Sequence, residues 1–217
     1  QRQMCIRDSR INILFDGDAL AGSFDLGDSD ALTFGATSCG HYFESPGDIS
    51  LEGVGSVDDF KQRLALAHVI IDQSDRRAAI IDGARSLAKS VDCKVNEAQL
   101  GGYIQDIAGL VESPTALLGQ IEDRFMNLPP ELLQATIATH QKYITLQDRS
   151  GNFSPYFIVV SNRKSDPKRD PVILAGNQRV LRARLADAEF FWQEDQKQGL
   201  ESYVAELQAV TFYEGLG

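Results

Sequence analysis

The sequence predicts an α+β fold, in which strands and helices mix without a regular strand–helix repeat. Segment 75–91 has apolar residues at helical spacing, whereas 143–147 and 156–160 are short apolar runs that read as a hairpin on either side of a turn. The hydrophobic fraction of 43% is ordinary for a globular protein. Together these observations indicate a mixed sheet-and-helix domain with its own apolar core.

The beginning of the chain predicts short strands joined by polar turns. Residues 11–15 form an apolar run that we expect to end a strand, and 31–37 suggests another strand. The polar segment 17–30 between them is expected to form turns, and 40–48 a loop.

Helices are expected next. Ser56-Val57-Asp58-Asp59 has the Ser-x-x-acid pattern of a capping box, which predicts a helix through about residue 67. A brief strand is expected over 69–72. Residues 75–91 and 98–108 predict two further helices, the second weakened by a pair of glycines.

The second half predicts an edge strand, the hairpin and more helices. Pro114 places the strand 111–119 at a sheet edge or a bulge, because proline cannot donate to a β-ladder. The Pro129-Pro130 pair favours a helix from 131 to about 140, since the fixed φ of proline suits a first helical turn. A last helix is expected over 200–209.

Three parts are expected along the chain. Residues 1–10 resemble a translated sequencing adapter and are left out of fold reasoning. Residues 11–170 are expected to form the α+β domain. Residues 171–217 are expected to open a helical domain whose amphipathic pattern is unfinished at the last residue, as in an interior piece of a longer protein.

Residues 176–192 carry the most informative pattern, an arginine-rich amphipathic helix. Leu181 and Leu185 lie on its apolar stripe, and Arg184 falls inside the same arc with Asp187 one turn on. An unpaired charge on a buried face is costly, so we expect Arg184 and Asp187 to form a structural ion pair. Asn177 is expected to be the N-cap of this helix.

Basic residues gather in one band of an otherwise acidic chain. The net charge is −10, yet residues 140–184 contain nine Lys or Arg against three acidic residues. Such a band is what selective contact with an RNA backbone needs, although a solvated loop around Asp166-Pro167 would explain part of it. The candidate RNA-binding residues are His140, Gln141, Lys142, Arg163, Lys164, Lys168, Arg169, Arg179 and Arg182.

Several other classes of site lack their sequence patterns. There is neither a phosphate-binding P-loop nor a G-x-G-x-x-G strand–helix turn, and we expect no catalytic residue in this chain. The three histidines are scattered, so no metal site is expected. No run of apolar residues is long enough to span a membrane. Few, separated cysteines are typical of a reducing cytoplasm, where we expect the protein to act.

Five motifs resemble, in order, the β subunit of the bacterial two-subunit glycyl-tRNA synthetase. They are Gly40-His41 with Ser45-Pro46-Gly47, Gly109-Leu110-Val111-Glu112 with Pro114, Leu128-Pro129-Pro130-Glu131, His140-Gln141-Lys142-Tyr143, and the run GNQRVLRARLADAEFFW at 176–192. The sequence departs from the family pattern at Tyr42 and Glu44, where Arg and His are usual.

The resemblance implies a division of labour between two subunits. A catalytic α subunit would use ATP and Mg, while this chain would bind tRNA(Gly) and the α subunit and hold no cofactor of its own. The mixed domain would be similar to the editing-type domain of the phenylalanyl-tRNA synthetase β subunit, and the following helices would open an HD-type domain. Two alternatives stay open: a hydrolytic editing domain acting on mischarged tRNA, and a purely structural domain for subunit assembly.

Overall fold

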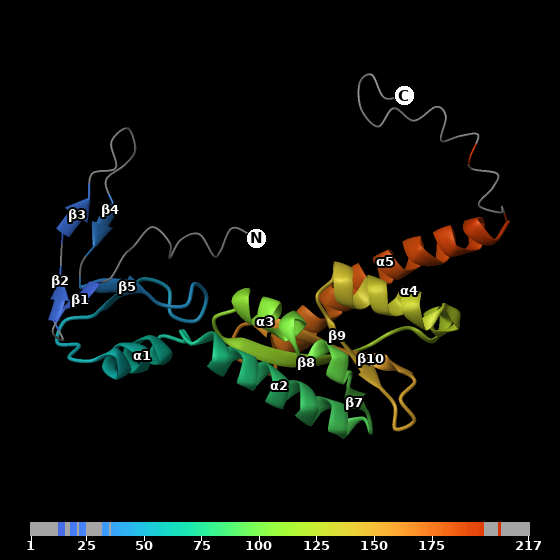
Figure 1. Cartoon of the computed structure of the whole chain (residues 1–217), viewed down its shortest axis with the longest axis horizontal. Coiled ribbons are helices and arrows are strands. Elements are labelled where there is room, and N and C mark those ends of the chain that lie inside the picture. The colour runs from blue at the N-terminus through green and yellow to red at the C-terminus, as the bar shows by residue number, and fades with distance from the viewer. Residues whose placement is uncertain are drawn as a thin grey trace, which may run out of the picture.

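The structure is a computed structural model that describes residues 36–197 and 204, except for the Glu97 side chain, and the backbone alone of 13–15, 18–20, 22–24 and 32–34. Figure 1 shows the arrangement of its elements. The segment 1–10 and nearly all of the helix expected over 200–209 lie outside the described residues.

A four-stranded antiparallel sheet forms the centre of the molecule, in agreement with the predicted α+β class. Its strands are β7 (Lys94–Val95), β9 (Ile144–Gln147), β10 (Phe153–Asn162) and β8 (Pro114–Gln120), in the order β7-β9-β10-β8. The β9–β10 hairpin is confirmed, and β8 is an edge strand that begins at Pro114, as the proline predicts.

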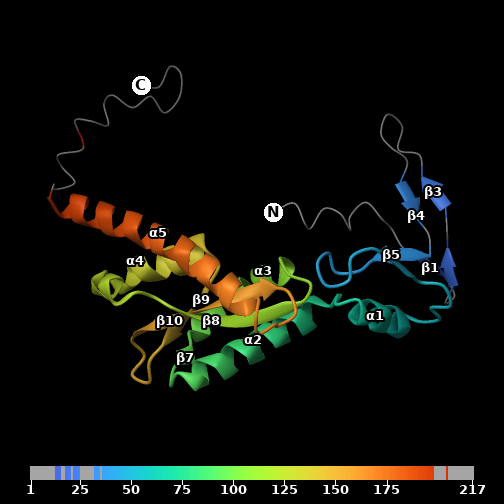
Figure 2. The same ribbon diagram turned by 180° about the vertical axis from the view of Figure 1, so that it is seen from behind.

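Alternation along β10 gives the sheet two apolar faces. Ile158 belongs to one core cluster, whereas its neighbours Phe157 and Val159 belong to the other. All three side chains are at most 4% exposed. The sheet is therefore covered on both sides, and Figure 2 shows α2 and α5 on opposite sides of it.

One face is covered by α2 (Gln73–Ser90) and α3 (Gly102–Gly109). Ile80, Ala84 and Ala88 of α2 recur at helical spacing and are all buried, which confirms the helix predicted there. The helix expected over 98–108 is instead interrupted: a short 3-10 helix, η2 (Glu97–Gln99), precedes α3, whose N-cap is a glycine. Two consecutive glycines favour such a break because their backbones are conformationally free.

The other face is covered by a second set of helices. These are the 3-10 helix η3 (Asp123–Asn127), α4 (Pro130–Gln134), its π-helical continuation η4 (Ala135–His140), and α5 (Asp170–Lys197). Leu181 and Leu185 of α5 are buried in the same cluster as Phe157 and Val159. The first half of α5 therefore packs on the sheet of the α+β unit, although the sequence placed a domain boundary at its start.

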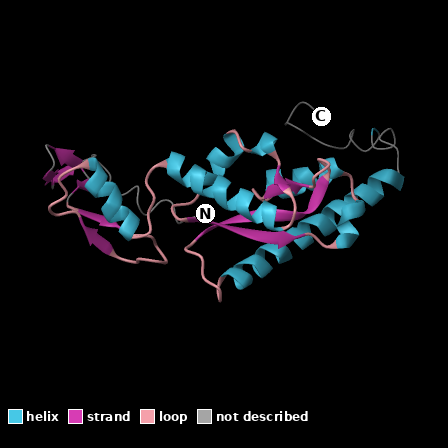
Figure 3. Ribbon diagram, turned by 90° about the horizontal axis from the view of Figure 1, so that it is seen from below, coloured by secondary structure: helices cyan, strands magenta, loops and turns pink. Residues whose placement is uncertain are grey.

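The remaining elements lie to one side of the sheet, as Figure 3 also shows. They are the antiparallel pairs β1–β2 (Ile13–Phe15, Asp18–Leu20), β3–β4 (Gly22–Phe24, Leu32–Phe34) and β5–β6 (Thr37–Cys39, Asp48–Ser50), and α1 (Val57–Leu66). The Ser56 side chain accepts a hydrogen bond from the Asp59 amide at 3.1 Å, so the predicted cap of α1 is confirmed.

Two expectations about this region are wrong. The segment 17–30 contains β2 and β3 rather than turns alone. Residues 69–72 form no strand: the Ile70 amide donates to the Glu112 carbonyl, but the carbonyls of Ile70 and Ile71 accept from the Arg76 guanidinium at 2.5 and 2.6 Å and not from a second strand. The pattern of apolar residues cannot show that an arginine side chain, and not a neighbouring strand, donates to these carbonyls.

Candidate nucleic-acid interface

Helix α5 offers three different surfaces, which follow from its 100° per residue. Leu181 and Leu185 point into the core and are 2% and 1% exposed. Arg182 lies on one flank of this buried stripe and Arg184 on the other. Arg179 lies opposite the stripe and is exposed. The three arginines therefore cannot act as one contiguous cluster.

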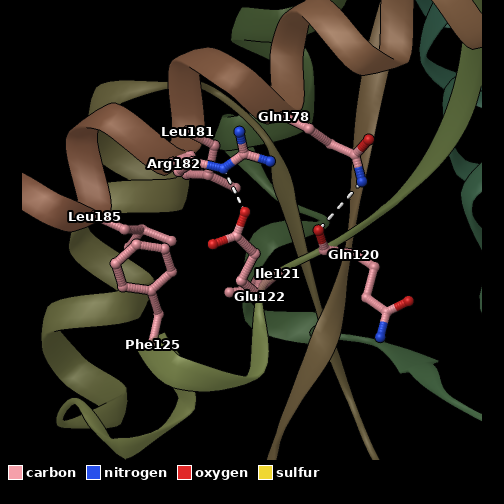
Figure 4. Close-up of a pocket in the computed structure, with 8 residues that line it drawn as sticks. All are labelled: Gln120, Ile121, Glu122, Phe125, Gln178, Leu181, Arg182 and Leu185. Atoms are coloured by element: carbon pink, nitrogen blue, oxygen red, sulfur yellow. Dashed lines mark hydrogen bonds and ion pairs between the residues drawn. The ribbon is translucent and has the colours of Figure 1, made fainter.

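Arg182 is held by an acidic partner from another element. Its Nε donates to the Glu122 carboxylate, which also accepts from Arg124 at 3.2 Å, and Gln178 donates to the Gln120 carbonyl at 3.2 Å. Figure 4 shows the Arg182–Glu122 and Gln178–Gln120 contacts around a small pocket between α5 and the segment after β8. Sequence analysis found no acidic partner for Arg182 within its own helix, and the structure supplies one 60 residues away.

The Glu122 carboxyl is stabilised in its charged form by these arginines. Partial burial raises its pKa, but hydrogen bonds from Arg182 and Arg124 outweigh that effect and hold the pKa below the ordinary value of 4.5. The Glu122 side chain is 40% exposed, so solvent screens both ion pairs.

The opposite flank of α5 forms a groove with η4. His140 and Gln141 line this groove together with Arg184 and Asp187. Its other lining residues are Leu132, Thr136, Ala188, Phe191, Trp192 and Asp195. The structure therefore brings two of the predicted RNA-binding residues beside an arginine that the sequence assigned to a structural pair.

The structure does not contain the expected Arg184–Asp187 ion pair among its described residues. Both side chains are exposed on the groove. The apolar arc predicted from the sequence, which includes Arg184, is wider than the stripe of α5 that packs on the sheet. The Arg184 guanidinium therefore stays in contact with water. Arg184 therefore needs no partner for solvation.

The expected N-cap role of Asn177 is also wrong. Helix α5 begins at Asp170, so Asn177 lies two turns inside it. Its side chain donates to the Ile173 carbonyl at 2.8 Å and accepts from the Tyr143 hydroxyl at 2.8 Å. Asp166 instead caps the turn that leads into α5, because its carboxylate accepts from the Lys168 and Arg169 amides at 2.8 and 2.9 Å.

Lys142 lies at the end of η4 in a left-handed backbone conformation, with φ of 58°. Its ammonium group is 5.5 Å from the centre of the Tyr103 ring, at cation–π distance. The Tyr103 hydroxyl donates to the carbonyls of Ala138 and Tyr143 at 2.9 and 3.0 Å. Burial of that hydroxyl raises its pKa well above the ordinary range. Lys142 is exposed, so its charge is accessible from solvent.

The basic loop after β10 divides into two kinds of residue. Lys164 and Lys168 are exposed and form no ion pair among the residues that the structure describes. Arg163 and Arg169 instead converge on Glu44 of the loop 40–47, at 3.1 and 3.0 Å. Burial raises the pKa of the Glu44 carboxyl, but the hydrogen bonds and charges of these two arginines together outweigh burial and hold that pKa below 4.5.

Two further residues, for which sequence analysis gave no binding role, hold this loop. His41 is fully buried, and its Nδ1 accepts from the amides of Phe43 and Glu44 at 3.3 and 3.2 Å. Its Nε2 is 3.2 Å from the Asn162 side-chain oxygen, which also accepts from the amides of Glu112 and Ser113. His41 and Asn162 therefore join the loop to the ends of β8 and β10. Only the Gly40-His41 motif signalled this site in the sequence.

Metal and membrane sites find no support in the described part of the chain. No group of three or more His, Cys, Asp or Glu side chains there is placed to hold a metal ion. None of the described helices combines the length and the apolar character needed to cross a bilayer.

Comparison with known proteins gives one consistent family. A family model described as "Glycyl-tRNA synthetase beta subunit" matches residues 9–217. Glycine–tRNA ligase beta subunits of Rhodospirillum centenum and Rickettsia felis are 36% and 37% identical, each over 94% of this chain and 30% and 29% of the relative. That of Synechocystis sp. is 38% identical over 94% of this chain and 27% of the relative. The chain thus spans less than a third of the length of these relatives.

Proposed function

Because the chain belongs to the glycyl-tRNA synthetase beta subunit family, we propose that it supports tRNA binding and assembly with a catalytic α subunit in the ATP-dependent charging of tRNA with glycine. In this proposal the α subunit supplies the ATP and Mg chemistry, in the cytoplasm, and the present chain contributes a surface. A resemblance of the α+β unit to the editing-type domain of the phenylalanyl enzyme is part of the same proposal.

The observation that carries the RNA-binding role is the set of exposed cationic and polar side chains on two sides of α5. His140, Gln141 and Arg184 line one groove, and the exposed Lys142 follows Gln141 in the chain. Arg179 is exposed on the outer side of the same helix and forms no ion pair within the described residues. Exposed, unpaired cations are available to phosphate groups, whereas Arg182 must first leave Glu122.

A tRNA titration tests this proposal. We expect the 217-residue chain to bind tRNA(Gly) with an affinity that falls steeply with salt, because each phosphate contact releases counterions. Arg179→Ala with Arg182→Ala should weaken binding and reduce the salt dependence. Arg184→Ala, alone, tests the groove side of the helix. Binding that survives all three substitutions would remove α5 from the interface.

A hydrolytic role has one observation in its favour. His140 and Asp187 line the same groove, and an imidazole or a carboxylate can act as a general base toward water. Release of free amino acid from mischarged tRNA, lost in His140→Ala, would support editing. The absence of release from a folded protein that binds tRNA would leave binding as the function.

A further inference from the structure

Glu44 occupies the position of an anion between two guanidinium groups. Its Oε1 is 3.1 Å from Arg163 Nε and 3.0 Å from Arg169 Nη1, and its Oε2 is 3.3 Å from Arg169 Nη2. The carboxylate comes from the loop 40–47, which is 119 residues away from Arg163 in sequence. A carboxylate held by two arginines has the same donor arrangement that a phosphate group would meet.

The carboxylate leaves this donor set incomplete. Arg169 Nε is buried without a hydrogen-bond acceptor among the described residues, and an Asp166 carboxylate oxygen is 3.9 Å from it. Two guanidinium groups present more donors than one carboxylate can accept, because a carboxylate has only two oxygens. A phosphate has more acceptor oxygens in a tetrahedral arrangement, so it would satisfy the site better than Glu44 does.

One exposed aromatic ring lies directly against Arg163, and a second packs against the first. The Arg163 guanidinium lies 4.4 Å from the centre of the Phe43 ring, and Tyr42 packs edge-on against Phe43 at 4.8 Å between centroids. Tyr42 is 55% and Phe43 41% exposed, although large aromatic side chains are usually buried. Exposed rings next to arginines are the combination that binds unstacked bases and their phosphates.

We propose that Arg163, Arg169, Tyr42 and Phe43 form a binding site for single-stranded RNA that Glu44 closes in the RNA-free protein. A backbone phosphate displaces the Glu44 carboxylate from the arginines, and the adjoining base stacks on the Tyr42–Phe43 rings. The exposed Lys164 and Lys168 flank the site and attract the strand. This inference rests on the proposed function, since it assigns one subsite of the tRNA-binding surface.

Glu44→Gln tests the closure directly. The substitution keeps the shape of the side chain and removes the charge that competes with phosphate. We expect the 217-residue chain with Glu44→Gln to bind tRNA(Gly) and a short single-stranded RNA about five- to tenfold more tightly than the unsubstituted chain, with a steeper salt dependence. In the Glu44→Gln background, Tyr42→Ala should reduce this gain, and Arg163→Ala with Arg169→Ala should abolish it.

Asp92→Asn is the matched control, because it also removes one negative charge and releases an arginine, Arg149, that is not among the proposed RNA-binding residues. We expect less than a twofold change in affinity. An equal gain in both variants would overturn the proposal, since net charge alone would explain it. Binding by the unsubstituted chain that Glu44→Gln leaves unchanged would overturn the closure and leave the proposed function intact. Absence of binding by every variant, each shown to be folded by circular dichroism, would overturn both.

Discussion

Glu44 and Glu122 each hold two arginines, but they do so in different surroundings. The Glu44 side chain is 11% exposed. It connects the loop 40–47 to the segment after β10, which contains Arg163 and Arg169. The Glu122 side chain is 40% exposed and connects α5 to the segment after β8. The number of ion pairs is the same at both sites, while access to water differs about fourfold.

This difference determines what each cluster can do. At an exposed site, water stabilises charges almost as well as a partner does, so the ion pair adds little to stability and its arginines exchange partners readily. At a shielded site, the arginines depend on the carboxylate, and removing it leaves two cations poorly solvated. We therefore expect Glu44 to control the shape of its site, and Glu122 to be a minor contact.

The largest expected effect comes from disturbing the loop that presents Glu44. A Cβ at Gly40 would collide with the Ser45 carbonyl oxygen and lie 2.9 Å from the Ser45 hydroxyl. Because the obstacle is backbone, Gly40→Ala should lower the free energy of unfolding by about 3 kcal/mol. Urea denaturation measures this value.

Gly176→Ala is the control for that experiment. Gly176 lies within α5 and a Cβ there would meet nothing within 4 Å, so alanine should raise the free energy of unfolding by about 0.5 kcal/mol. Equal effects at the two glycines would show that the loop 40–47 does not need its present conformation.

Removing the two carboxylates separately compares the clusters directly. Glu44→Ala should lower the free energy of unfolding by about 2 kcal/mol, below the range for fully buried pairs because the arginines keep some contact with water. Glu122→Ala should change it by about 0.5 kcal/mol or less. Denaturant titrations of both variants give the values, and a larger loss at Glu122 would contradict the burial argument.

Acid should remove the contribution of Glu44 in a defined direction. Its pKa in the folded protein lies below the ordinary 4.5, so its stabilising effect is complete above that value and is lost as the pH falls through the lower, folded-state pKa. The difference in unfolding free energy between the unsubstituted chain and Glu44→Gln should be constant above about pH 5.5 and shrink below about pH 4.5. A difference that persists unchanged at pH 3 would show that the charge of Glu44 is not the cause.

Salt should produce the smallest effect and should separate the two sites. Raising the ionic strength shortens the Debye length to about 3 Å at 1 M, which screens exposed pairs more than shielded ones. The stability difference caused by Glu122→Gln should therefore fall by a few tenths of a kcal/mol toward zero, while that caused by Glu44→Gln persists. Thermal unfolding at low and high salt measures both. Parallel loss at the two sites would mean that water reaches Glu44 as freely as Glu122.

Features that depend on neighbouring residues could be predicted from the sequence alone. The cap at Ser56, the buried stripe of α2, the β9–β10 hairpin and the edge position of Pro114 all follow from spacing and backbone chemistry within a few residues. The family of the chain is equally a property of the sequence, since the motifs that indicate it are read in order along the chain.

The partners of the charged residues were decided only by the tertiary structure. Arg182 meets an acid 60 residues away, and Arg163 and Arg169 meet Glu44 across 119 and 125 residues. Arg184 stays unpaired within the described residues because the sheet buries only a narrow stripe of α5. The width of that stripe cannot be predicted from helical periodicity. Local periodicity states which side of a helix is apolar. Which charges face each other depends on how the sheet, the loop 40–47 and α5 pack, because Coulomb attraction acts through space and not along the chain.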